Sequence, residues 1–423
     1  MNRSTAVLVA LALALAPCTL RADDDAFVAQ AREAVREALA ACTADGGAFW
    51  GRSLCGPIVV VEPPTRRAFA SESPQIVGFT PTGGGWVGTL PAEINVANTA
   101  FDWSGRRWTM VMTPLPGDPV DRRALLLHEL THRIQADLGF AAASAANAHL
   151  DGELGRVWLA LEGRALAVAL GADGTARESA VADALLFRAR RWQIHPGSRE
   201  EEIDLETGEG LPEATGALLA EPAAAANRAR AGLARLEGEG LTRSFAYATG
   251  PAYGVLLESL APGWRRRIGD RADFMALLRT GGRFPETPVG EIAARAETRS
   301  GGYGFAEVSG RERQRATRRT QEKAELVDAL VDGPRLTVPL SAAQISFDPN
   351  RVTPFPPHGT IYRAARLSDA WGTLDAEILL VNGNWSQAAV SLPAAGTWEL
   401  VPAEGWRVVQ DGANQRLERG PAE

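Results

Sequence analysis

Two histidines and a glutamate in this chain have the types and spacing that bind and use a metal ion. They are His128, Glu129 and His132, in the stretch LLLHELTHRIQ. In a helix, residues four apart project to one side, so the two imidazoles converge beside the glutamate. Such a pair can hold zinc, and the carboxylate can take a proton from a metal-activated water. With only five histidines in the chain, roughly 0.007 such motifs are expected by chance, which favours a metal site over two structural histidines.

The helix that must carry this motif is marked in the sequence. Asp118 can cap its N-terminus, Pro119 suits the first helical position, and Gly139 is typical of a helix end. Its apolar residues recur on one side: Leu126, Leu127, Leu130, Ile134 and Leu138. The alternating segment before it, residues 106–116, is expected to be a strand. That strand is either the sheet edge that pairs with an extended substrate or an ordinary half-buried strand.

A catalytic zinc ion needs a third protein ligand, and two downstream glutamates are the main candidates. Glu162 lies among apolar residues, where a buried carboxylate needs a metal or a base; an ion pair with an arginine is its alternative. Glu209, in ETGEGLPEATG, is followed four residues later by Glu213, which could accept the free ring N–H of a ligating histidine. A surface helix N-terminus is the alternative for Glu209. We prefer Glu209 over Glu162, with Glu153 as a further possibility.

A resemblance to a known family supports this choice. HELTH, EGLPE and FAYATGPAYGVLLESL together resemble the gluzincin metallopeptidases, and more narrowly the exported bacterial proteins of the peptidase-MA-like group. The resemblance covers about residues 108–260, and HELTH is its one highly specific motif. It implies a zincin-like fold and one zinc ion per chain. The implied roles are metal ligands at His128, His132 and Glu209, the general base at Glu129, and an oxyanion-stabilising hydroxyl at Tyr253 or, as second choice, Tyr247.

The chain departs from the family pattern around the glutamate. Gly208 stands where asparagine or serine is usual, and Ala214 where an aromatic residue is usual. Pro212 would disturb a helix unless it lies in the first turn. Glu209 also follows His132 by 77 residues (209 − 132), a long separation for this superfamily.

The N-terminus predicts export. Residues 1–22 have a basic start, a short apolar run and a small residue before DDD, as a secretory signal peptide does. A lipoprotein anchor on Cys18 fits less well, because proline precedes it. In an oxidising compartment, periplasmic or extracellular, Cys42 and Cys55 are expected to form a disulfide rather than stay free thiols. No other apolar run is long enough for an integral membrane span.

The order of elements predicts an α+β fold. We expect a zincin-like domain over 23–330, with a mixed α/β part at 23–117 and a mainly helical part at 118–330, then a small β-rich domain at 335–423. A net charge of −7 without a basic tract argues against nucleic acid as a partner.

The expected function is that of an exported zinc metallopeptidase acting on peptides or proteins, with Glu129 as general base. Alternatives are a catalytically silent zincin-fold binding or scaffold protein of the cell envelope, and a hydrolase of non-peptide amides. Because a silent relative has no need of the base, retention of Glu129 favours an enzyme.

Overall fold

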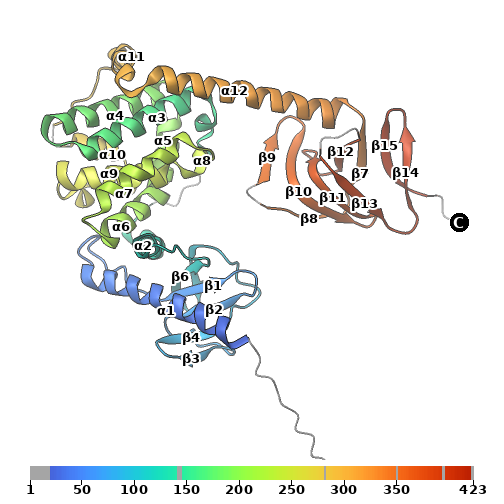
Figure 1. Ribbon diagram of the computed structural model, residues 1–423, viewed down its shortest axis with the longest axis horizontal. Helices are drawn as coiled ribbons and strands as arrows, with labels where there is room; N and C mark the ends of the chain where they lie inside the picture. Colours follow the sequence, from blue (N-terminus) through green and yellow to red (C-terminus); the bar gives the residue numbers. More distant parts are fainter. Residues whose placement is uncertain (1–19, 141–144, 281–282, 349–350, 393–395, 421–423) are drawn as a thin grey trace, which may run out of the picture. The chain divides into compact units, whose positions relative to one another are not determined.

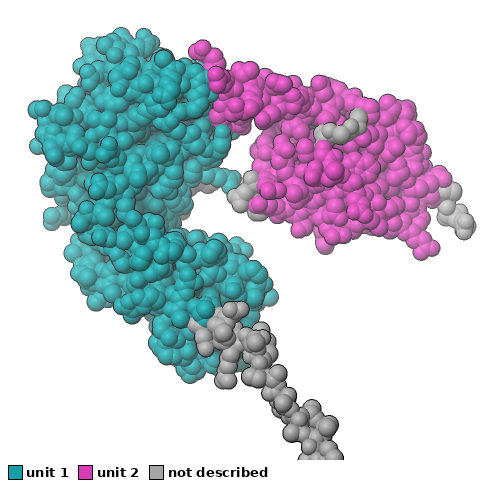
Figure 2. Space-filling model, viewed as in Figure 1, with its two compact units in different colours: residues 1–312 teal, residues 313–423 magenta. Residues whose placement is uncertain are grey.

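The computed structural model divides the chain into two compact units, residues 1–312 and 313–423 (Figures 1 and 2). The boundary falls inside helix α12, Phe305–Val327. Most of the expected signal peptide lies outside the described residues, which are 20–140, 145–280, 283–348, 351–392 and 396–420. Helices and sheets are both extensive, so the prediction of an α+β protein is confirmed.

Unit 1 begins with a helix, α1 (Leu20–Asp45), and a mixed sheet. The sheet has six strands in the order β3-β4-β2-β1-β6-β5, with β1 and β6 parallel and the other pairs antiparallel. The strands are β1 (Ile58–Glu62), β2 (Arg67–Ala70), β3 (Thr80–Thr82), β4 (Gly85–Thr89), β5 (Thr99–Trp103) and β6 (Arg106–Met112).

Both faces of this sheet are covered by apolar groups. Ile58 and Val60 pack against α1 and α2 (Pro119–Gln135), which lie on one face of the sheet. Val59 and Val61, which alternate with them, pack on the other face beside Trp108. The period of two along β1 therefore fixes which face receives the helices.

Of the two alternatives for the segment 106–116, the structure favours the ordinary half-buried strand. The segment 106–116 does not form the edge, because β6 lies between β1 and β5. The physical reason is a tight hairpin: Ser104 and Gly105 have φ angles of 49° and 74°, as a type I′ turn requires, and fold β5 onto β6. The free edge next to the HELTH helix is therefore β5.

The rest of unit 1 is helical and surrounds a second core rich in leucine and alanine. Its α-helices are α3 (Glu153–Gly171), α4 (Gly174–Ile194), α5 (Ser198–Leu205), α6 (Leu211–Ala220), α7 (Ala225–Gly232), α8 (Leu241–Ser244), α9 (Ala246–Leu260), α10 (Phe274–Arg279) and α11 (Ile292–Ser300). Shorter turns are η1 (Ala136–Leu138), η2 (Ala148–Asp151), η4 (Leu233–Glu237), η5 (Trp264–Arg266), η6 (Val289–Glu291) and η7 (Gly301–Tyr303). A π-helical turn, η3 (Glu206–Gly210), joins α5 to α6.

Unit 2 contains the end of α12, the turn η8 (Asp328–Asp332) and a nine-stranded sheet around Leu336, Trp371 and Leu374. The sheet order is β14-β15-β7-β12-β11-β10-β8, with β13 on β11 and β9 on β10. Its strands are β7 (Arg335–Pro339), β8 (Gln344–Ser346), β9 (Val352–Phe355), β10 (Gly359–Asp369), β11 (Gly372–Val381), β12 (Gln387–Ser391), β13 (Trp398–Pro402), β14 (Trp406–Asp411) and β15 (Asn414–Arg419).

The expected disulfide between Cys42 and Cys55 is present. It ties the end of α1 to the segment that leads into β1. Arg133 of α2 donates hydrogen bonds to the carbonyls of Leu54 and Cys55, so the same segment is also held to the HELTH helix. In the described part of the chain, no helix combines the length and hydrophobicity needed to cross a membrane.

Removing this disulfide is expected to destabilise unit 1. The bridge closes a sequence separation of 13 residues, so a Cys42→Ala/Cys55→Ala variant should lose about 3 kcal/mol of unfolding free energy. Urea denaturation with and without reductant measures this loss. The double variant also serves as the control, because reductant should lower the free energy of unfolding of the wild type and leave that of the variant unchanged.

Candidate metal centre

Helix α2 forms where the sequence predicts it, and two of its three motif residues are buried. The Asp118 carboxylate accepts from the backbone N–H groups of Val120 and Asp121 at 2.8 and 3.0 Å, which caps the helix. His128 and Glu129 are buried in unit 1, at 3% and 4% exposure. The Nε2 atoms of His128 and His132 lie 3.0 Å apart, so the two imidazoles converge as expected.

The π-helical turn η3 brings Glu209 to this pair. Its Oε2 atom lies 3.4 Å from Nε2 of His128 and 3.5 Å from Nε2 of His132. Among the described residues, these three side chains form the group whose ligand atoms are close enough to hold one metal ion. A π turn re-aims a side chain within a helical segment and is common at functional sites.

Two close backbone contacts set the positions of the neighbouring helices. A Cβ on Gly216 of α6 would stand 2.4 Å from the carbonyl oxygen of Ala124 in α2. A Cβ on Gly250 of α9 would stand 2.3 Å from the carbonyl oxygen of Gly210 in η3. Only glycine permits such approaches. Ala124 lies one helical turn before His128, and Gly210 directly follows Glu209. The two glycines that permit these contacts are therefore a sequence signal for assembly of the site, which the sequence motifs did not reveal.

The outer ring nitrogens of both histidines are bound to acceptors. Nδ1 of His128 donates to Oε2 of Glu213 at 2.8 Å, the partner that the sequence analysis proposed. Nδ1 of His132 lies 2.9 Å from Oε1 of Gln135, a residue that the sequence analysis did not select. In neutral imidazoles these bonds place the free lone pair on Nε2 of each ring.

Gln135 also connects His132 to the turn that carries Glu209. Its Nε2 atom donates to the carbonyls of Thr207 and Gly208, at 2.7 and 3.2 Å, which fixes the orientation of the amide. Pro212 lies in the first turn of α6 and lacks the N–H that would otherwise bind the Gly208 carbonyl. The proline therefore leaves an acceptor open for Gln135 and does not break the helix.

The acceptors around this centre favour positive charge there. Burial alone lowers the pKa of His128, but hydrogen bonds to Glu209 and Glu213 outweigh burial and raise that pKa to about 10. Burial raises the pKa of Glu209, but hydrogen bonds from His128, His132 and Tyr247 outweigh it and hold that pKa well below its usual range. Two imidazoles and one carboxylate are a ligand set that zinc accepts in catalytic sites.

Tyr247 is the tyrosine that reaches the centre. Its hydroxyl donates to Oε2 of Glu209 at 2.6 Å, and its ring stacks on His128 with centroids 5.6 Å apart. Burial and the bond to Glu209 raise the pKa of this hydroxyl well above its ordinary value. Tyr247 was the second choice from the sequence, after Tyr253.

Glu129 faces the centre without a partner of its own. Its Oε2 atom is buried and forms no hydrogen bond with any described residue. Burial raises the pKa of this carboxyl group. An unpartnered buried carboxylate oxygen costs free energy, and a proton to bind or a water to polarise would relieve that cost. This orphaned atom fits the presence of a metal and its water beside the histidines.

The structure corrects two candidates, Glu162 and Tyr253. The Glu162 carboxylate accepts from Arg188 at 2.8 Å and from Arg191 at 2.6 Å, with all three side chains fully buried. The hydroxyl of Tyr253 donates to the same carboxylate at 2.6 Å. Glu162 thus has the arginine partners that were its alternative, and neither residue joins the histidine pair. Glu153, on the first turn of α3, is also outside the group.

This buried ionic network nevertheless supports the centre. Arg188 donates through both terminal nitrogens to Glu206, at 2.8 and 2.6 Å, and Thr249 of α9 donates to the same carboxylate at 2.7 Å. Glu206 opens η3, three residues before Glu209. The network therefore holds the turn that presents the third candidate ligand.

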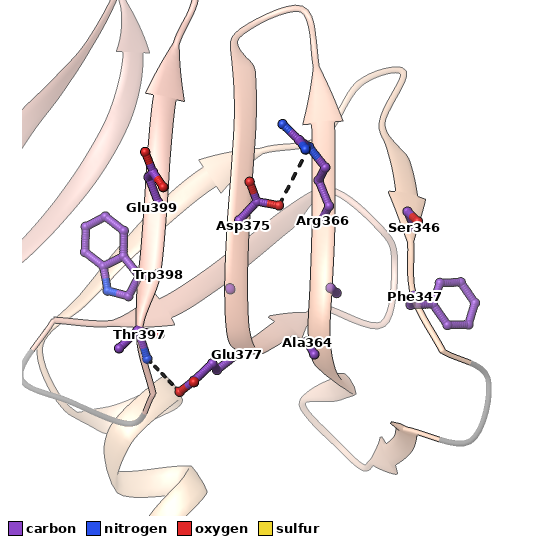
Figure 3. Close-up of a pocket in the computed structure, with 11 residues that line it drawn as sticks. Ser346, Phe347, Ala364, Arg366, Asp375, Glu377, Thr397, Trp398 and Glu399 are labelled. Atoms are coloured by element: carbon purple, nitrogen blue, oxygen red, sulfur yellow. Dashed lines mark hydrogen bonds and ion pairs between the residues drawn. The ribbon is translucent and has the colours of Figure 1, made fainter. Parts of the chain in front are cut away.

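A cleft of about 350 Å³ opens beside the centre. Residues 98–100, at the start of the β5 edge, line one side, and His132 and Glu209 line the other. Unit 2 has a hollow of about 580 Å³ (Figure 3). There Asp375 pairs with Arg366 at 3.7 Å, and Glu377 accepts from the Thr397 N–H at 2.9 Å, so these carboxylates are already engaged. Among the described residues, the group that could hold a metal ion is the one at the HELTH helix.

Comparison of the chain with models of known protein families, with curated proteins and with solved structures gave no match.

Substituting each of the two candidate glutamates in turn distinguishes their roles. When zinc is supplied, the wild type is expected to bind one ion per chain and Glu209→Gln almost none, because the substitution removes the charged ligand oxygen beside both histidines. Glu162→Gln should retain zinc but lower the free energy of unfolding by about 3–5 kcal/mol, since it leaves buried arginine charge uncompensated. Elemental analysis of folded protein and urea denaturation measure the two effects. Retention of zinc by Glu209→Gln would contradict this assignment.

Gln135 is expected to affect metal affinity through His132. Gln135→Leu should weaken zinc binding about 10–100-fold, as loss of an outer-shell partner typically does. Gln135→Glu should not restore it, because a carboxylate would repel the Thr207 and Gly208 carbonyls. Competition with a chromophoric chelator measures the affinities, and Gln193→Leu, on α4, is the control. Wild-type affinity in Gln135→Glu would show that only the acceptor matters.

Proposed function

We propose that this protein is a zinc-dependent metallopeptidase with a zincin-like domain in unit 1. The observation that supports the proposal best is the convergence of His128, His132 and Glu209 beside the unpartnered carboxylate of Glu129. Two neutral imidazoles and a carboxylate leave one position of a tetrahedral zinc ion open for chemistry. When bound there, zinc would act as a Lewis acid that acidifies water and polarises a carbonyl group.

Glu129 is the base in this mechanism. Its free Oε2 atom takes a proton from the attacking water and delivers it to the nitrogen of the departing amine. The neighbouring histidines keep their orientation during this transfer, because Glu213 and Gln135 hold their outer nitrogens. One carboxylate thus serves first as base and then as acid.

Tyr247 is the proposed donor to the developing oxyanion. Its hydroxyl already lies at the edge of the centre, where it donates to Glu209, and rotation toward the substrate would let it donate to the carbonyl oxygen instead. A single donor of this kind typically contributes about 3 kcal/mol to transition-state stabilisation. The high pKa of this phenol keeps it protonated and able to donate.

The β5 edge gives the substrate a place to bind. An extended peptide can add to an exposed strand through main-chain hydrogen bonds. Because residues 98–100 line the same cleft as His132 and Glu209, a peptide paired with β5 would pass the centre. An unfolded segment of a protein, or a peptide, is therefore the substrate class that this cleft fits.

The enzyme is favoured over a catalytically silent scaffold by Glu129 itself. A buried carboxylate oxygen without a partner costs roughly 1–3 kcal/mol, which a binding protein could avoid by a simple substitution. The disulfide between Cys42 and Cys55 supports export to an oxidising compartment, the periplasm or the exterior.

Replacement of the base tests the proposal. Glu129→Gln should bind one zinc per chain as the wild type does, while hydrolysis of quenched fluorescent peptide pools should fall about 10²–10⁴-fold, the usual contribution of a general base. Wild-type protein treated with a chelator should lose activity and regain it with zinc. Equal hydrolysis by Glu129→Gln and wild type would refute Glu129 as the base, and no hydrolysis by zinc-loaded wild type would refute the peptidase.

A further inference from the structure

The cleft beside the metal centre contains a single arginine among its described lining residues. Apart from His132 and Glu209, every other residue there is neutral except Arg107, on β6. The carboxylates around the centre are those of Glu129, Glu209 and Glu213, so three negative charges exceed the two positive charges of a zinc ion. Arg107 is therefore the group that could make the cleft accept an anionic substrate.

The alternation of β6 directs Arg107 toward the cleft. Trp108 and Met110 pack into the core on the far face of the sheet. Thr109 points to the near face, where its hydroxyl lies 3.5 Å from the carbonyl oxygen of Glu129. Arg107 shares that face and lies two residues from Thr109, about 7 Å along the strand. The backbone of Arg107 is therefore about two strand residues from the point where β6 contacts the main chain of Glu129, and Arg107 lines the same cleft as His132 and Glu209.

The present partner of Arg107 is easily exchanged. Its Nη1 atom lies 3.1 Å from Oδ2 of Asp102, directly across the hairpin. The two side chains are 46% and 76% exposed, so solvent screens this pair and it contributes little to stability. A guanidinium can also bind a carboxylate through two parallel N–H donors, which favours a second acid in the cleft.

We propose that Arg107 selects peptides with an acidic side chain about two residues from the bond that is cut. This inference rests on the proposed peptidase function and on pairing of the substrate with β5. A peptide extended along β5 advances about 3.4 Å per residue, so a side chain two positions from the scissile carbonyl reaches Arg107. An aspartate or glutamate at that position would replace Asp102 as the partner of Arg107, or would bind Arg107 together with Asp102.

Matched peptides and a matched variant test the inference. Zinc-loaded full-length protein is given pools of quenched peptides that carry Glu, Gln or Lys at one fixed position. The wild type should prefer Glu over Lys by about 10-fold in kcat/KM, and the preference should shrink at high salt. Arg107→Glu should reverse it. The control is Arg106→Glu, which changes the neighbouring arginine on the opposite face, where it pairs with Glu72, and should leave the preference intact.

The outcomes separate the two proposals. Equal cleavage of the three pools by wild type, or the same reversal by Arg106→Glu, overturns the role of Arg107 and leaves the peptidase standing. No cleavage of any pool overturns the peptidase, and the inference with it. If Arg107→Glu does not fold, Arg107→Gln takes its place: loss of the Glu-over-Lys preference supports the inference, and a wild-type preference overturns it.

Discussion

A buried network built on two arginines supports the turn that presents Glu209, and Arg188 binds that turn directly through Glu206. The side chains of Arg188 and Arg191, and of the glutamates that they bind, are fully buried. Burying such ions costs several kcal/mol each, and the cost is offset only when nearly every charged oxygen has a donor. Here Tyr253 and Thr249 supply donors beyond the arginines. The network joins α3, α4, α9 and η3, so the position of the centre depends on it.

Precision at the centre comes from contact between backbones. Metal ligands must be held within about 0.5 Å of their working positions. Long side chains between helices would leave that much freedom, whereas Gly216 against Ala124 and Gly250 against Gly210 bring the helix backbones together. Pro212 then leaves a carbonyl open for Gln135, and the amide links His132 to the turn of Glu209. Gly208 and Pro212 thus take part in building the site.

The proposed chemistry follows from an imbalance of donors and acceptors. His128, His132 and Glu209 direct acceptor atoms to one point, and Glu129 adds an oxygen with no partner. In the hollow of unit 2, by contrast, Asp375 pairs with an arginine and Glu377 accepts from a backbone N–H group. An imbalance of this kind is costly in a static structure, and a cation with a water would remove it.

Local patterns in the sequence determined the HELTH helix, its Asp118 cap, the disulfide and the α+β class, because each depends on residues close in the chain. Tertiary structure alone decided the partners of the buried carboxylates. The sequence left both Glu162 and Glu209 as candidate ligands, but Arg188, 26 residues after Glu162, neutralises the first, while η3 carries the second to the histidines. Tyr247 and Tyr253 share one helix, and only the packing of that helix decides which faces the centre. Likewise, the sequence left residues 106–116 as either an edge strand or an ordinary half-buried strand, and the hairpin turn that places β5 outside them decides for the second.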